Sequence, residues 1–97
     1  MSIRKIYKRV VCADGFTISM QASHMTNCRP KDDSGPYSKI EMAYPNRGDS
    51  LIQRYAEDPD DPTRTIYSYV PADIVRRLIA KHGGVVAGEV PPLVGGA

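Results

Sequence analysis

One segment near the C-terminal end limits what this 97-residue chain can fold into. Between Pro71 and Gly83-Gly84, apolar residues recur with helical spacing, which predicts an amphipathic helix whose apolar stripe is Ile74, Val75, Leu78 and Ile79. A proline suits the first position of a helix, and the two glycines supply a left-handed stop. Because a helix of about ten residues is marginal in isolation, its apolar stripe must be buried against the rest of the chain.

The segments that precede this helix have β-strand character. Residues 6–12 and 16–22 are rich in β-branched or alternating apolar residues and flank Ala13-Asp14-Gly15, which predicts a hairpin. Two further strands are expected at residues 37–44 and 65–70. Residues 23–36 contain several Pro, Gly, Asn and Asp residues, so they predict a long loop, and a loop of this length is a candidate binding loop.

The hairpin has two alternative registers. A three-residue loop with Gly15 in the left-handed region places Cys12 opposite Phe16 and Val10 opposite Ile18, whereas a two-residue Asp14-Gly15 turn slips the pairing by one residue. Such a slip exchanges the two faces of the first strand. We prefer the three-residue loop, because it gathers apolar side chains on the buried side, namely Ile6, Val10 and Cys12.

The order of these elements predicts an α+β fold. We expect a small antiparallel sheet of about four strands that begins with the N-terminal hairpin, with the C-terminal helix packed on one face. A short helix at about residues 51–56, capped by Asp49 or Ser50, should precede the last strand. Residues 1–84 then form a single domain, and residues 85–97 form a Gly/Pro/Val-rich tail that is flexible or laid along another surface.

Composition excludes several classes of protein. Thirteen Lys and Arg against eleven Asp and Glu give a net charge of +2, which neither requires nor excludes nucleic acid. No apolar run approaches the roughly 20 residues that span a bilayer, and no apolar segment of signal-peptide type follows the basic N-terminus. We therefore expect no membrane association and a cytoplasmic location, where the two cysteines would be free thiols.

Few residues have the chemistry of a metal or catalytic site. Cys12, His24, Cys28 and His82 are the soft metal-ligand candidates, but they lack the paired spacing of zinc sites. We expect Cys12 in the core and both histidines at the surface. Adjacent carboxylates occur only in connecting segments, and there is no glycine-rich phosphate loop. We therefore expect no cofactor, no metal and no enzymatic activity.

Tyrosines and arginines indicate a binding surface instead. Six tyrosines are many for this length, and basic residues cluster near residues 4–9 and 76–81. Tyr and Arg are enriched at protein interfaces and also stack on bases. The predicted partner-binding residues are Arg76, Arg77, Tyr67, Tyr69, Arg9 and Tyr7. The alternative is that the tyrosines complete a small core.

Four stretches together resemble a group of small hypothetical proteins of tailed bacteriophages. They are Val11–Phe16 with Gln21-Ala22, Asn27–Pro30, Tyr55–Asp58, and Tyr67–Pro71 leading to Lys81–Gly84. The resemblance spans most of residues 6–92 and carries over no functional residue. It implies the cytoplasm of an infected host cell, or the virion, as the setting of the protein.

These observations lead to one functional expectation with two alternatives. We expect a phage-encoded, non-catalytic binding protein that inhibits a host factor, with an antiviral defence component as the expected target. The alternatives are a minor structural or decoration protein of the virion and a protein that sequesters a small nucleotide. The partner is accordingly a host or virion protein, while a nucleotide ligand and a homo-oligomer are left open.

Overall fold

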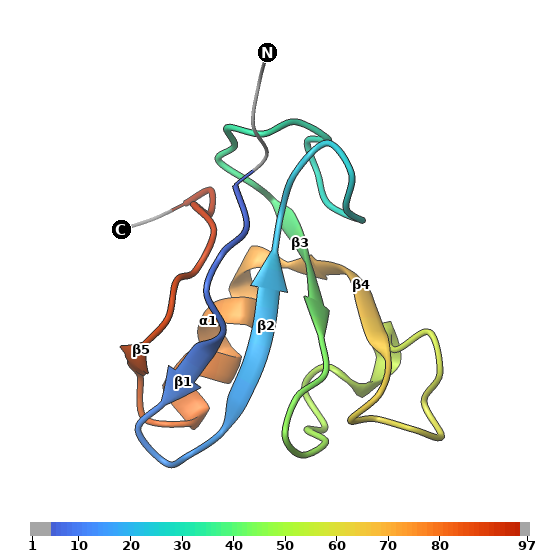
Figure 1. The fold of residues 1–97 in the computed structure, drawn as a ribbon, viewed down its shortest axis with the longest axis vertical. Coiled ribbons are helices and arrows are strands. Elements are labelled where there is room, and N and C mark those ends of the chain that lie inside the picture. The colour runs from blue at the N-terminus through green and yellow to red at the C-terminus, as the bar shows by residue number, and fades with distance from the viewer. Residues whose placement is uncertain (1–4, 96–97) are drawn as a thin grey trace.

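Five antiparallel strands and one α-helix make up the fold, in a computed structural model that describes residues 5–95 (Figure 1). The strands, in the order β4-β3-β2-β1-β5 across the sheet, have the bounds β1 Val10–Cys12, β2 Thr17–Gln21, β3 Lys39–Ala43, β4 Ile66–Pro71 and β5 Val85–Ala87. The helices are α1 Ala72–Lys81 and the short 3-10 helix η1 Gln53–Tyr55. The α+β class is confirmed, with five strands. Among residues 5–95, no helix is long and apolar enough to cross a membrane.

The hairpin register is the one that gathers apolar side chains on the buried side. Val10 lies opposite Ile18, and the Cys12 N–H donates to the Phe16 carbonyl at 2.8 Å. The three-residue loop closes with Gly15 at φ 91°, a left-handed conformation that strongly favours glycine. One part of the prediction is wrong, because β1 is shorter than expected and Ile6 is 61% exposed.

The core lies between α1 and one face of the sheet. Figure 1 shows α1 behind the strands, and its buried side chains Val75 and Leu78 meet the alternate residues that the strands direct toward it. Those residues are Val10, Cys12, Ile18, Met20, Ile40, Met42 and Val70. Successive side chains of a strand point to opposite faces of the sheet, so the side chains between these core residues lie on a second face, which α1 does not cover.

The limits of α1 follow the predicted signals. Pro71 is the N-cap and has an extended backbone, with ψ 148°. At the other end the Gly84 N–H donates to the Ile79 carbonyl at 2.9 Å, which satisfies one of the free carbonyls of the last turn. Asp73 lies in the first turn and Lys81 in the last, and both charges are favourable at those ends of the helix dipole.

Residues 85–95, expected as a tail outside the domain, are instead built into it. β5 pairs with β1, and the Glu89 N–H donates to the Lys8 carbonyl at 3.1 Å. Further on, the backbone of Tyr37 exchanges hydrogen bonds with Pro92 and Val94, at 2.8 and 2.9 Å. The physical reason is that β1 would otherwise leave a row of unpaired backbone groups on its outer side. Residues 96 and 97 of the expected tail lie outside the described residues.

The packing of α1 predicts a large effect of shortening Leu78. This side chain is fully buried, so Leu78→Ala should lower the free energy of unfolding by about 2–5 kcal/mol. Arg77→Ala, an exposed position on the same helix, is the control and should change it by less than about 0.5 kcal/mol. Urea unfolding measures both. A loss of a few tenths of a kcal/mol for Leu78→Ala would mean that α1 does not cover the sheet.

The docking of β5 predicts different effects of two glycine substitutions. Gly84 and Gly88 have nearly the same backbone, at φ 92° and 91°, but a Cβ at Gly88 would collide with the Arg9 carbonyl, whereas one at Gly84 would meet nothing within 4 Å. Gly84→Ala should therefore cost only the conformational term of about 1–2 kcal/mol. Gly88→Ala should lower the unfolding free energy by clearly more. Equal losses would contradict the docking of this segment on residue 9.

Candidate functional site

The six predicted binding residues do not form one surface. Tyr67 is 1% exposed, and its hydroxyl donates to the Pro62 carbonyl at 2.6 Å. Tyr7 is 9% exposed. These two tyrosines therefore belong to the core, as the alternative interpretation of the tyrosines held, and neither is free to contact a partner. Tyr69 is half-buried, with the Arg29 guanidinium 4.7 Å from the centre of its ring.

Of the three predicted arginines, two lie on α1 and one lies on the opposite side of the sheet. On α1, Arg76 donates to the Val94 carbonyl at 2.7 Å and so fastens the C-terminal segment, while Arg77 beside it is exposed. Arg9 lies on the sheet face opposite α1, because its neighbour Val10 points into the core. There it donates to the Thr17 hydroxyl at 3.0 Å and to the Tyr44 carbonyl.

The face of the sheet that α1 leaves uncovered is polar and has small side chains near its middle. It includes five residues at positions that alternate with the core-facing ones along β2 and β3: Thr17, Ser19, Gln21 and Glu41, which are half-buried, and Ala43, which is 8% exposed. In Figure 1 this face is turned toward the viewer, with α1 on the far side. We call these five residues the open face.

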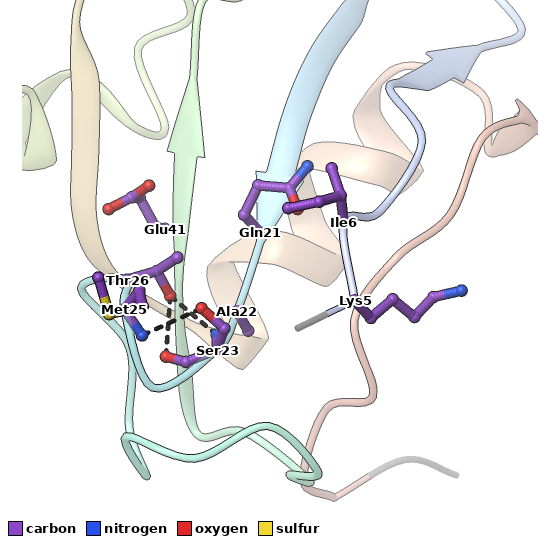
Figure 2. Close-up of a pocket in the computed structure, with 8 residues that line it drawn as sticks. All are labelled: Lys5, Ile6, Gln21, Ala22, Ser23, Met25, Thr26 and Glu41. Carbon is purple, nitrogen blue, oxygen red and sulfur yellow. Dashed lines mark hydrogen bonds between the residues drawn. The ribbon is translucent and has the colours of Figure 1, made fainter. Parts of the chain in front are cut away.

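A cavity of about 210 Å³ lies at one end of the open face (Figure 2). Three segments of the chain form its walls: Lys5 and Ile6, residues 21–23 with 25 and 26 at the end of β2, and Glu41 of β3. The predicted binding loop was residues 23–36, and the first part of that loop lines this cavity. Glu41 and the N-terminal wall were not predicted, because these segments come together only through the pairing of the strands.

Gln21 holds the N-terminal wall of the cavity in place. Its amide oxygen accepts the Tyr7 N–H at 2.9 Å, and its amide nitrogen donates to the Tyr7 carbonyl at 2.7 Å. The Gln21 amide thus makes the two backbone hydrogen bonds that a neighbouring strand would make, at a residue that precedes the start of β1. Because both ends of the amide are used, Gln21 fixes the wall and leaves the recognition of a ligand to other residues.

The loop side of the cavity is fixed by hydrogen bonds among Ser23, Met25 and Thr26, drawn as dashed lines in Figure 2. The Ser23 N–H donates to the Thr26 hydroxyl at 3.0 Å, which donates back to the Ser23 carbonyl at 3.3 Å. The Met25 N–H donates to the Ser23 hydroxyl at 3.1 Å. This tight turn keeps Met25 at the rim, where its side chain is 67% exposed.

The cavity carries a negative charge next to apolar side chains. Glu41 accepts the Asn27 N–H at 3.2 Å through one carboxylate oxygen. Lys5 is also in the wall, but its ammonium pairs with Glu89 at 3.0 Å, and Figure 2 shows it on the other side of the cavity from Glu41. Ile6 and Met25 are the exposed apolar members of the wall.

A second cluster of charged groups surrounds His82, which is 5% exposed. Its ring stacks on Phe16, with 4.0 Å between the ring centres, and its two nitrogens lie 2.6 Å from an Asp14 oxygen and 2.7 Å from an Asp49 oxygen. The expectation of a surface position is therefore wrong for His82, whereas His24 is exposed. Because both ring nitrogens of His82 already have carboxylate partners, the cluster holds the end of α1 against the segments that carry Asp14 and Asp49.

The two carboxyl groups around His82 have lowered pKa values. The hydrogen bond from His82, followed by one from the Phe16 N–H, lowers the pKa of Asp14. Burial raises the pKa of Asp49, but the Leu51 N–H, His82 and Lys81 together lower it below its usual value. Both groups therefore favour the charged form in the folded protein.

Neither cysteine belongs to a reactive site. Cys12 is buried in the core, as expected, and burial is the main cause of its raised pKa. Cys28 is also buried, and its thiol donates to the Ser23 carbonyl at 3.2 Å. In the part of the chain that the structure describes, no group of three or more His, Cys, Asp or Glu could hold a metal ion.

The lowered pKa of Asp49 predicts how stability responds to acid. Its pKa in the unfolded chain is about 3.9, so its contribution to stability is complete above that pH and is lost as the pH falls through the lower pKa of the folded state. Asp49→Asn should be less stable than the wild type at pH 7, and the difference should narrow at pH 3. Urea unfolding at the two pH values measures it, with exposed Asp60→Asn as the control. A difference that is equal at both pH values would contradict this role of Asp49.

Comparisons with known proteins add no relative to this description. No protein-family model matches the chain, and neither the curated proteins nor the solved structures contain a match. The geometry of the open face and its cavity therefore carries the functional argument.

Proposed function

We propose that the chain is a non-catalytic, phage-encoded binding protein that attaches to a protein partner through the open face and the cavity at its end. The observation that carries the proposal is the cavity itself, in which a carboxylate held by a hydrogen bond lies beside exposed apolar side chains at one end of the open face. Interfaces between proteins combine such pockets with a surrounding surface that excludes water.

The size of the cavity favours a protein partner over a small molecule. Sites for small molecules and cofactors usually have volumes of about 300–1,000 Å³. At about 210 Å³ this cavity is smaller and suits one side chain of a partner. A stable complex covers about 800 Å² of each protein, which is about a seventh of the 5415 Å² of this molecule's surface. The open face with its rim is the surface we assign to this contact.

The biological part of the proposal rests on the resemblance to small phage proteins. A domain of this size blocks a larger protein by covering a surface that the latter needs, without any chemical step. We propose a host factor as the partner and an antiviral defence component as its type. The nucleotide-sequestering alternative receives no support from the positions of Arg9 and Arg76, which lie on opposite sides of the sheet and bind the chain's own carbonyls.

Partner capture with two surface variants tests this proposal. A tagged chain is cross-linked in phage-infected bacterial host cells, and captured proteins are identified by mass spectrometry. Ser19→Arg puts a long charged side chain in the middle of the open face, whereas Arg77→Glu reverses a charge on α1, at a binding residue predicted from the sequence. We expect one host protein with the wild type and with Arg77→Glu, and its loss with Ser19→Arg.

Three results would contradict the proposal. Capture that survives Ser19→Arg but not Arg77→Glu would move the interface to the predicted arginine surface of α1. Capture of virion proteins alone would favour the structural alternative. A stabilising shift in melting temperature with a cyclic dinucleotide would favour nucleotide sequestration, because a ligand that binds only the folded state stabilises it.

A further inference from the structure

We propose that the cavity beside Glu41 takes the side chain of an arginine or a lysine of the protein partner. This inference rests on the proposed function, because it names the chemistry that the same cavity recognises. Its basis is the combination of one carboxylate, exposed apolar side chains and a volume that suits one side chain.

The charge of the cavity favours a cation. Among residues 5–95, the charged members of its wall are Glu41 and Lys5, and the ammonium of Lys5 is paired with Glu89 at 3.0 Å. Lys39 lies on the same face of β3 as Glu41 but does not line the cavity. An acidic side chain entering the cavity would be repelled by the Glu41 carboxylate. An apolar side chain would displace water from that carboxylate without replacing the hydrogen bonds that the water makes.

A second carboxylate lies beside Glu41 along the sheet. Glu57 accepts the Ser68 hydroxyl at 2.7 Å and the Asn27 side-chain amide at 3.4 Å, and the backbone N–H of the same Asn27 donates to Glu41. Asn27 therefore links the two acidic residues. Two carboxylates near one another strengthen the attraction for a cation that approaches this end of the open face.

The apolar rim suits the rest of a basic side chain. Arginine and lysine carry three or four methylene groups behind the charge, and these stems pack on apolar surfaces while the charged end reaches a polar group. Ile6 is 61% exposed and Met25 is 67% exposed, so both offer such a surface. The flexible thioether of methionine adapts to stems of different shape.

The cavity is also formed before any ligand arrives. Gln21 fixes the N-terminal wall, and the hydrogen bonds between Ser23 and Thr26 fix the loop wall. Binding then requires little ordering of the protein, which preserves more of the interaction free energy. A preformed cavity that presents the Glu41 carboxylate distinguishes a basic side chain from a neutral one of the same shape.

Titration with blocked amino acids tests the inference without knowledge of the partner. Nα-acetyl-arginine N-methylamide and its lysine counterpart are added to 15N-labelled protein, and amide shifts are followed by NMR. The matched neutral probes are the citrulline and norleucine derivatives. We expect saturable shifts at residues 21–26 and 41, with Kd about tenfold or more lower for the basic probes, as a charge-assisted hydrogen bond implies.

Glu41→Gln is the matched variant, because glutamine keeps the oxygen that accepts the Asn27 N–H and removes only the charge. It should raise Kd for the basic probes by about tenfold or more, whereas Asp73→Asn on α1 should leave it unchanged. The dispersion of the same spectra shows whether each variant is folded. Equal binding of arginine and citrulline, undiminished binding to folded Glu41→Gln, or no binding of any probe would each overturn the inference.

The outcomes separate this inference from the proposed function. If the basic probes fail to bind while partner capture still depends on Ser19, the open face is the interface and the cavity recognises another group. If the probes bind as expected while capture is insensitive to Ser19→Arg, the proposed interface fails and the cavity remains a site for a basic side chain.

Discussion

The imidazole of His82, held between Asp14 and Asp49, joins three parts of the chain that are distant in sequence. Asp14 lies in the β1–β2 turn, Asp49 precedes η1, and His82 follows the last turn of α1. A buried polar ring must have partners for both nitrogens, and leaving one buried polar group without its hydrogen-bond partner typically costs about 1–3 kcal/mol. The geometry therefore fixes the end of the helix against the hairpin turn, and with it the face of the sheet that the helix covers.

The same contact determines where the C-terminal segment can run. The Asp14 N–H donates to the His82 carbonyl at 3.2 Å, and the Ala13 N–H donates to the Gly84 carbonyl at 3.0 Å, so the chain leaves α1 directly beside β1 and continues as β5. Glu89 then binds both Lys5 and the backbone of Lys8, which holds the N-terminal wall of the cavity. The shape of the cavity thus depends on a segment whose composition resembles that of a tail.

Local signals in the sequence were sufficient for part of this structure. The turn chemistry of Gly15 and the alternation of β2 predicted the hairpin register, and helical spacing with a glycine stop predicted the buried Leu78. Each of these rests on residues close together in sequence. Other contacts join residues at least 14 positions apart: the pairing of β5, the hydrogen bonds of Gln21 to Tyr7, and the contacts of His82. The spacing of residues within one segment does not predict such contacts.

The tyrosines show how a local rule fails. Simple alternation puts Tyr67 and Tyr69 on one strand face, but the register shifts along the β3–β4 pairing and Tyr69 has φ 55°, so the alternation of β4 is broken. Tyr67 enters the core, and Tyr69 lies against Arg29. The open face, by contrast, follows from the regular alternation of β2 and from a β2–β3 pairing whose register does not shift between Ser19 and Gln21.

Hydrogen exchange of the chain, measured by mass spectrometry alone and in complex with its captured partner, tests most directly whether the open face and its cavity form the binding surface. The account predicts new protection in residues 17–26 and 39–43, with exchange in the exposed turns of α1 unchanged. Protection confined to residues 72–82 of the helix, with the open face exchanging as in the free protein, would contradict it.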